Sequence, residues 1–421
     1  MPVDRRISNR KTNPEDDRLR ELIAAQPKGC ALQQVFYSDP SIYALDVERI
    51  FMRRWLCVGH ESRIPNSGDF FVHEIAGESL IIVRGRDEVV RALVNVCRHR
   101  GSEVCYEKEG NAKALVCPYH AWAYELDGSL RAARQMNESI DKSEYGLTQI
   151  HVQIQEGLIF VCFADDPPKL NDVEQTLRAS LGRYGWAGAK VAHRGIYSVD
   201  ANWKLAMENY FECYHCGPAH PEFARHHATE RHLDPEAEVL REKARERSRA
   251  MGIEIPEVSN WPWPAMPGEE SVSAFQDATY PGSVTGSEDG QAVAPLMGDF
   301  TDYDGGFSYV DVGPASTFLA YPDYGVMYLF IPRDTQTTDM EIVWLVAKDA
   351  KEGVDYQLDR LIWMWDVTSI ADKRIIDHNQ KGVNSRYYRP GPYSPMESMS
   401  QSMTEWYLEQ ITPRSADEPP K

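Results

Sequence analysis

The chain has 421 residues, which is too many for one hydrophobic core and indicates two or three domains. Its 42% hydrophobic and 26% charged residues are typical of a soluble globular protein, and no apolar run reaches membrane-spanning length. The formal charge of −19 opposes general binding to nucleic acid, because phosphates would be repelled. With few cysteines and no apolar signal-peptide core, we expect a cytoplasmic protein with no membrane and no nucleic-acid partner.

The first part of the chain is expected to form a small antiparallel β domain. Residues 1 to about 20 are charged and lack apolar periodicity, which is typical of a mobile arm. Residues 43–55 have apolar side chains at helical spacing, so we expect a helix there. The run Asp165-Asp166-Pro167-Pro168 indicates a domain boundary. Between the helix and this boundary, strands and hairpins are expected within 70–97, 115–130 and 152–163.

Two cysteine–histidine pairs lie in loops of this β region. Cys97-x-His99 is followed, after seventeen residues, by Cys117-x-x-His120. Two thiolates and two imidazoles are the ligands of a Rieske [2Fe-2S] cluster, in which histidines on one iron raise the reduction potential. A structural zinc site is the alternative, although Cys-x-His is an unusual spacing for zinc. The pattern favours a [2Fe-2S] cluster held by Cys97, His99, Cys117 and His120.

Beyond the boundary the pattern changes to a mixture of helices and strands. Residues 252–305 are rich in Pro, Gly and Ser, and we expect a long surface loop there, containing Trp261-Pro262-Trp263-Pro264. Helices are expected over 171–184, 235–251 and about 353–380, the second of them charged and facing solvent. Strands are expected at 307–312, 315–322, 324–332 and 340–348.

A second set of metal-binding side chains lies in the segment 202–223. It contains Glu212, His215 and His220, and two histidines with a carboxylate form the facial triad of non-heme Fe(II) oxygenases. The two histidines are five residues apart, one more than a helical turn. They can still converge if the helix ends near Gly217-Pro218. Ordinary helix histidines are the alternative, because the chain has twelve histidines.

The carboxylate of the triad is expected on the long helix 353–380. Asp372 shares a helical face with Leu361, Trp365 and Ile376, so it points toward the apolar side, where a metal would offset the cost of burying a carboxylate. Asp366 and Asp377 lie on more polar faces. A structural ion pair at Asp372 is the alternative role. The aspartates available on this helix are Asp355, Asp359, Asp366, Asp372 and Asp377.

Over nearly its full length the chain resembles the large (α) subunit of Rieske non-heme iron oxygenases. It is most similar to the branch that includes glycine betaine monooxygenase, choline monooxygenase and stachydrine demethylase. The similarity is carried by CRHRGS, CPYHAWAYELDG, ANWKLAMENYFECYHCGPAHPEF and the segment 348–394. It implies Cys97, His99, Cys117 and His120 as cluster ligands, and His215, His220 and Asp372 as ligands of a mononuclear Fe(II). It also implies that Glu212 bridges the two centres, where many relatives have the shorter Asp.

The resemblance implies an α+β fold. An N-terminal antiparallel β Rieske domain is joined to a catalytic domain with an antiparallel sheet flanked by helices, as in ring-hydroxylating oxygenase α subunits. We therefore expect an N-terminal arm and a helix that packs on the catalytic domain over 1–45, the Rieske domain over 46–166, the catalytic domain over 167–412 and a disordered tail over 413–421.

The same family resemblance implies a homotrimer. Within one chain of this family the centres are too far apart for rapid electron transfer, and head-to-tail packing brings the cluster of one subunit beside the iron of the next. A carboxylate that binds a ligand histidine on each side would orient both rings. The chain has no G-x-G-x-x-G motif after a strand, so electrons are expected from a separate NAD(P)H-dependent reductase.

The implied reaction is O2 activation at Fe(II) followed by N-demethylation or hydroxylation of a quaternary ammonium compound such as glycine betaine, stachydrine or choline. Aromatic side chains would hold such a cation. The alternative enzyme is a ring-hydroxylating dioxygenase or demethylase that acts on an aromatic acid. A Rieske electron carrier and a zinc-binding interaction module are the non-enzymatic alternatives, but an electron carrier has no need of a second domain with a triad.

Overall fold

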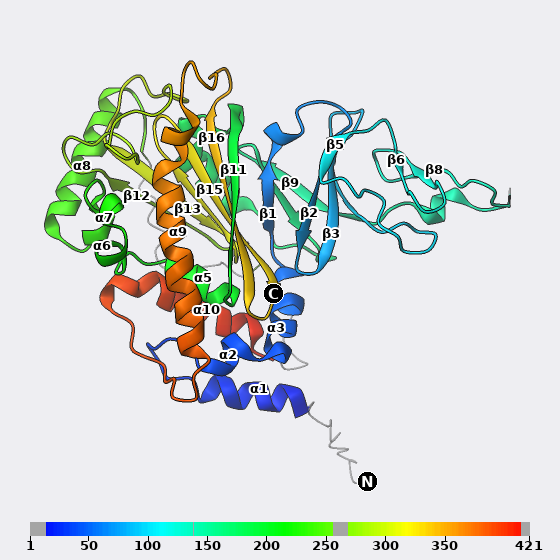
Figure 1. Ribbon diagram of the computed structural model, residues 1–421, viewed down its shortest axis with the longest axis horizontal. Helices are drawn as coiled ribbons and strands as arrows, with labels where there is room; N and C mark the ends of the chain where they lie inside the picture. The colour runs from blue at the N-terminus through cyan, green and yellow to red at the C-terminus, as the bar shows by residue number, and fades with distance from the viewer. Residues whose placement is uncertain (1–13, 138, 256–267, 414–421) are drawn as a thin grey trace, which may run out of the picture.

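The computed structural model describes residues 14–137, 139–255 and 268–413, most of which belong to two antiparallel sheets and the helices around them (Figure 1). The first sheet has the strand order β1-β10-β9-β4-β3-β2-β5, and a three-stranded sheet, β6-β7-β8, extends from it. The strands and hairpins expected within 70–163 are confirmed. Their bounds are β1 (Leu56–His60), β2 (Asp69–Ile75), β3 (Glu78–Arg84), β4 (Val90–Val94), β5 (Glu109–Asn111), β6 (Leu115–Val116), β7 (Ala123–Tyr124), β8 (Leu130–Ala132), β9 (Gln149–Gln155) and β10 (Leu158–Cys162).

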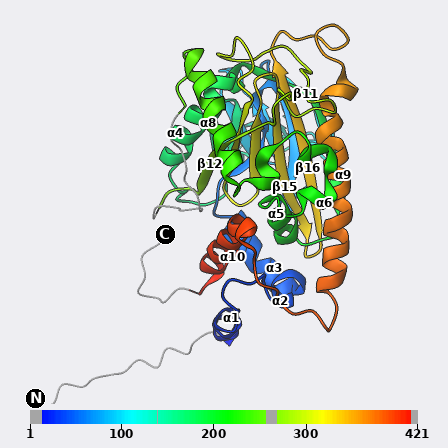
Figure 2. The same cartoon turned by 90° about the vertical axis from the view of Figure 1, so that its left-hand side faces the viewer.

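The second sheet has the strand order β11-β16-β15-β14-β13-β12. Its central strands are buried along most of their length because helices or other strands cover both faces. Figure 2 shows α8 and α9 along opposite borders of this sheet. The four strands expected between 307 and 348 are confirmed. The bounds are β11 (Ala189–Val199), β12 (Val272–Ala278), β13 (Gly306–Val312), β14 (Ser316–Ala320), β15 (Gly325–Asp334) and β16 (Thr337–Ala347).

The helices lie mainly below and around the second sheet (Figure 1). The long helix and the charged helix expected in the second half are confirmed, as is the expected α+β fold. Within the described residues, none of the helices combines the length and the apolar character needed to cross a membrane. The bounds are α1 (Pro14–Ala24), α2 (Gln34–Ser38), α3 (Pro40–Asp46), α4 (Asn171–Leu181), α5 (Trp203–Tyr210), α6 (Cys216–Ala219), α7 (Pro221–Ala224), α8 (Pro235–Ala250), α9 (Leu358–Val383) and α10 (Ser398–Ile411).

Three details of the expected secondary structure are wrong. The arm expected up to about residue 20 contains α1, whose Pro14 and acidic first turn favour a helix start. The helix expected over 43–55 is present but ends earlier: α3 (Pro40–Asp46) continues as a π-helical turn at Val47–Phe51, so only the end beyond Phe51 is wrong. The loop expected over 252–305 contains β12, which forms because it pairs with β13 along its whole length. Residues 1–13, the tract 261–264 and the tail 414–421 lie outside the described residues.

A buried ion pair fixes the helix that leads into the candidate site. Asp46 at the end of α3 pairs with Lys204 on α5, and both side chains are fully buried. Trp203 donates its indole N–H to Asp46 Oδ2 (3.0 Å), and Tyr407 on α10 donates its hydroxyl to Oδ1 (2.8 Å). The N-terminal segment and the C-terminal helix therefore hold α5 in place from two sides.

Candidate active site

The two cysteine–histidine pairs lie on loops of the first sheet and its small extension. Figure 1 shows this extension, β6 to β8, at the end of the molecule away from α6 and α7. Backbone hydrogen bonds close each loop around its cysteine. The Cys97 amide donates to Ser102 O (2.8 Å) and the Cys117 amide to Trp122 O (2.8 Å). Both cysteines are almost fully buried, so their sulfur atoms are shielded from solvent.

The side chains around these loops fit a metal cluster. The rings of His99 and His120 have centroids 4.7 Å apart, and His99 stacks on Trp122 at 4.9 Å. The hydroxyl of Tyr124 lies 3.2 Å from Cys97 Sγ. His99 Nδ1 is buried and has no hydrogen-bond partner among the described residues. A buried polar atom without a partner is costly, and coordination to a metal would remove this cost.

The two histidines of the second motif converge through a short helical turn. After α5 ends at Tyr210, the chain forms α6, and His220 lies between α6 and α7. The amide of His220 donates to Cys216 O (2.8 Å), and the two histidine rings have centroids 5.1 Å apart. The break expected at Gly217-Pro218 is displaced to His220. Pro218 is tolerated in the first turn of α6 because its missing N–H has no intrahelical partner there.

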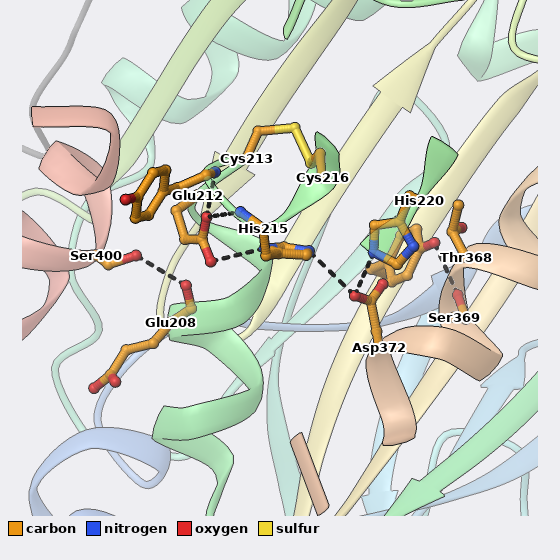
Figure 3. Close-up of polar contacts among 12 residues, drawn as sticks. Glu208, Glu212, Cys213, His215, Cys216, His220, Thr368, Ser369, Asp372 and Ser400 are labelled. Carbon is orange, nitrogen blue, oxygen red and sulfur yellow. Dashed lines mark hydrogen bonds and ion pairs between the residues drawn. A yellow bond between two sulfur atoms is a disulfide. The ribbon is translucent and has the colours of Figure 1, made fainter. Parts of the chain in front are cut away.

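Asp372 on α9 completes this group (Figure 3). Its Oδ1 lies 2.8 Å from His220 Nε2 and 3.3 Å from His215 Nε2. One potential ligand atom from each of the three residues lies within 4.8 Å of the others. The helical face expected for Asp372 is also observed, because Leu361 and Ile376 on that face are each 1% exposed. Two imidazole nitrogens and one carboxylate oxygen therefore face a common point, as a facial metal site requires.

The charges at this point favour a bound cation. Burial acts to raise the pKa of Asp372, but hydrogen bonds from His215 and His220 outweigh it and lower that pKa. Burial acts to lower the pKa of His215, but Asp372 and Glu212 raise it to about 9. Two carboxylates thus attract positive charge to the imidazoles, and a divalent metal would supply that charge in place of protons.

The competing aspartates of α9 have other partners. Asp366 accepts a hydrogen bond from the Tyr197 hydroxyl (2.5 Å). Asp377 accepts from the Asp200 amide (2.7 Å) and forms an ion pair with Lys373 (2.8 Å). Neither carboxylate approaches the two histidines. Asp372 therefore remains the candidate third ligand.

Glu212 binds a histidine of its own chain. Its Oε1 lies 2.7 Å from His215 Nδ1, on the side of the ring opposite Asp372. Its Oε2 accepts hydrogen bonds from the amides of Tyr214 (2.5 Å) and His215 (3.1 Å). These contacts fix the ring orientation and leave His215 Nε2 for a metal. Glu212 thus contacts His215 as the expected bridge requires, and the bridging role itself stays a prediction.

A disulfide between Cys213 and Cys216 encloses His215. Figure 3 shows it beside the loop that joins Glu212 to α6. The bond ties the two ends of that loop together around the histidine. Sequence reasoning missed this bond, although the C-x-x-C spacing was a signal for it.

A cavity of about 460 Å³ opens beside His215, His220 and Asp372. Sequence reasoning identified Glu212, His215, His220 and Asp372 on its wall, but not the aromatic rings or the other charged side chains. One signal was present, because Asp311 is a charged residue in a segment, FSYVDV, whose other residues are apolar, aromatic or serine. The rings on the cavity wall belong to Tyr210, Phe211, Phe223, Phe275, Tyr309, Tyr328 and Trp365, and the acidic and basic side chains include Glu238, Asp277, Asp311, Arg241 and Arg245.

Comparisons with known proteins identify both halves of the chain. The profile of the Rieske [2Fe-2S] domain matches residues 54–152, and that of the ring hydroxylating alpha subunit (catalytic domain) matches residues 184–413. The glycine betaine monooxygenase oxygenase subunit of Pseudomonas aeruginosa (strain UCBPP-PA14) is 34% identical over 93% of this chain and 91% of its own length. The carnitine monooxygenase oxygenase subunit of Escherichia coli (strain K12) is 30% identical over 84% of each chain.

Solved structures show the same architecture. A quaternary ammonium Rieske monooxygenase, described with carnitine oxidation, has a TM-score of 0.69 and 25% identity over 93% of this chain and 96% of its own. Naphthalene 1,2-dioxygenase from Rhodococcus sp. bound to indole has a TM-score of 0.66 at 18% identity, over 97% of this chain and 100% of its own, and so shares the fold. Sequence profiles, relatives and fold agree that this chain belongs to the family of Rieske non-heme iron oxygenase α subunits, with a [2Fe-2S] domain and a mononuclear iron domain.

Proposed function

We propose that the protein oxidises an N-methyl group of a quaternary ammonium compound such as glycine betaine, stachydrine or choline. The observation that carries this proposal is the aromatic cavity beside His215, His220 and Asp372. A quaternary nitrogen has no N–H to donate, so aromatic faces are the groups that hold it best. The similarity to glycine betaine and carnitine monooxygenase subunits supports the same substrate class.

The rings nearest the triad form one connected wall. Tyr328 packs against Tyr210 (centroids 5.0 Å apart) and against Trp365 (6.1 Å). Trp365 also lies 5.9 Å from Phe223, which follows His220 on α7. Because these rings adjoin the helices that carry the triad, a trimethylammonium group held against them would present a methyl group to it. The rings would also keep bulk water from the reacting carbon.

The residues that would hold the metals are His215, His220 and Asp372 for Fe(II), and Cys97, His99, Cys117 and His120 for the cluster. When bound, the iron supplies O2 activation and the cluster supplies single electrons. Glu212 holds His215 in the orientation and tautomer that leave Nε2 free to coordinate.

The proposed reaction consumes O2, two electrons and two protons, and one oxygen atom leaves as water. Hydroxylation of an N-methyl carbon gives a carbinolamine, which breaks its C–N bond and releases formaldehyde and a proton. The nitrogen keeps the bonding electron pair and becomes a tertiary amine. The product is therefore the N-demethylated compound, and formaldehyde is released as a co-product that can be measured.

We propose further that the working unit is a homotrimer that receives electrons from a separate NAD(P)H-dependent reductase. The loops for the cluster and the helices of the triad lie at opposite ends of the chain (Figure 1), which supports electron transfer between neighbouring subunits. Glu212 and His215 would form the acceptor half of that contact. The other half would come from a cluster histidine of the next subunit.

The test is turnover of a substrate panel by the iron-loaded protein with a reductase and NADH. Betaines, choline and carnitine are compared with aromatic acids, and formaldehyde and NADH are measured together. We expect formaldehyde release matched to NADH consumption for at least one methylammonium compound. Asp372→Ala, which should lack mononuclear iron, is the matched control for formaldehyde from other sources. Coupled turnover of an aromatic acid, with none of any methylammonium compound, would refute the proposed substrate class.

A further inference from the structure

The sheet side of the cavity has a row of side chains that crosses four strands. Ser273 on β12 pairs with Asp311 on β13, Asp311 with Thr317 on β14, and Thr317 with Tyr328 on β15. Directly paired residues of antiparallel strands point to the same face. The hydroxyl of Tyr328 lies 3.1 Å from Ser369 Oγ on α9, the helix that carries the triad carboxylate. Asp311 is two strands away from Tyr328, roughly 10 Å along the row.

Asp311 is a buried carboxylate without a positive partner. It is 3% exposed, and its Oδ2 accepts a hydrogen bond from Ser273 Oγ at 2.9 Å. No basic side chain among the described residues is paired with it, whereas Asp277 on the same face pairs with Arg241 on α8 (3.5 Å). Burial raises the pKa of Asp311 to about 7. A buried, ionised carboxylate costs free energy unless it is paired, so a cation beside Asp311 would stabilise its ionised form.

The surroundings of Asp311 are those of a binding site for an organic cation. Tyr210 on α5 and Tyr309 on β13 interact electrostatically with Asp311, and both line the cavity. Burial raises the pKa of both phenols far above the physiological range, so both are neutral. The ring of Tyr210 lies next to Tyr328, which connects Asp311 to the wall nearest the triad. Neutral rings beside a carboxylate attract an alkylammonium ion more strongly than either group alone.

We propose that Asp311 is the counter-ion of the substrate: its carboxylate and the faces of Tyr210 and Tyr309 bind the positive end of the substrate and select methylammonium compounds over neutral molecules of the same shape. This inference rests on the proposed function and adds the residue that determines its specificity. Asp277 is less suited to this role, because Arg241 lies 3.5 Å from its carboxylate.

The test compares a cation with its uncharged carbon analogue. Choline and 3,3-dimethylbutan-1-ol have the same shape, and tetramethylammonium is a probe that lacks the alcohol. Binding to the iron-loaded enzyme is measured by calorimetry without O2. Replacement of Asp311 by Asn should weaken binding of the two cations roughly 10- to 100-fold and leave the neutral alcohol unaffected. Ser273→Ala is the control: it removes the hydrogen bond to Asp311 but keeps the carboxyl group. Because that bond lowers the pKa of Asp311, the control is measured well above pH 7, where the carboxylate is ionised and the preference for cations should be retained.

The dependence of wild-type binding on pH gives a second readout that needs no variant. Asp311 is protonated below about pH 7, so cation affinity should fall about tenfold per pH unit below that value and level off above it. Tyr210 and Tyr309 stay neutral over this range. Glu238, Asp277, Arg241, Arg245 and His232 line the same cavity, so the uncharged alcohol is measured at each pH and only the change in cation affinity relative to the alcohol is assigned to Asp311. Unchanged cation preference in Asp311→Asn, or cation affinity independent of pH, would overturn the inference. Formaldehyde release by the wild-type enzyme would still stand as evidence for the proposed function.

Discussion

Substitution of Glu212 by Gln should disturb the orientation of the His215 ring without removing a metal ligand, so it tests the two effects separately. Gln has the same length and shape but lacks the negative charge and one acceptor oxygen. In the wild type, one carboxylate oxygen lies 2.7 Å from His215 Nδ1 while the other accepts two backbone N–H groups. Gln has only one acceptor oxygen. It can keep either the contact with His215 Nδ1 or the hydrogen bonds from the two backbone amides, because its NH2 group would face N–H donors at the remaining position.

The expected loss is that of one charge-assisted hydrogen bond, about 1.5–3 kcal/mol. If the activation free energy of electron transfer rises by this amount, the rate of electron transfer falls roughly 10- to 100-fold. Both metal centres should still load, because Glu212 is not among the expected ligands. Substrate binding should also persist.

The assay is single-turnover oxidation of the pre-reduced cluster, followed by its visible absorption in protein with measured iron content. Glu222→Gln is a matched control, since Glu222 Oε1 lies 4.0 Å from His220 Nδ1, beyond hydrogen-bond distance. That variant should oxidise its cluster at the wild-type rate. A wild-type rate in Glu212→Gln, with both metals present, would refute the bridging role and reduce Glu212 to a structural cap of the loop before α6.

Three further predictions concern the metals and stability. Asp372→Ala should lose mononuclear iron and turnover but keep the Rieske absorption spectrum, as metal analysis, activity and visible absorption would show. If Asp366→Ala loses iron and Asp372→Ala does not, Asp366 is the ligand and the assignment of Asp372 is wrong. His99→Cys should lower the potential of any cluster that assembles, because thiolate adds negative charge; an unchanged potential in redox titration would argue against His99 as a ligand. Asp46→Ala should lower the free energy of unfolding in urea by about 3–5 kcal/mol, because Lys204 would stay buried without a counter-charge; a loss below 1 kcal/mol would contradict this account.

The sequence predicted the parts of the site that depend on local spacing. His215 and His220 are close in the chain, and a short helical turn brings their rings together as expected. Asp372 is distant in the chain, but helical periodicity placed it on the apolar face of α9, where it meets both histidines. The ligand roles of these residues remain predictions, since the observed geometry supports coordination without testing it.

The remaining features depend on which strands pair and in which register. Asp311 meets Ser273 and lies in one row with Thr317 and Tyr328 only because β12 to β15 align in one order, and no local pattern specifies that order. β12 itself is stabilised by its pairing with β13, which outweighs its Pro- and Gly-rich context. The bond between Cys213 and Cys216 is local in the chain, but eight cysteines in 421 residues do not by themselves predict disulfides.

The three candidate iron ligands come from helices and turns, whereas the sheet supplies the cavity wall that contains Asp311. The candidate ligands and the cavity wall are therefore held by different secondary-structure elements. A substitution on β12 or β13 need not move His215, His220 or Asp372. New substrate preferences could thus evolve, or be selected in the laboratory, by varying inward-facing strand positions while the oxidising centre stays intact. A library restricted to Phe275, Tyr309 and Asp311 would sample substrate range without sampling loss of iron.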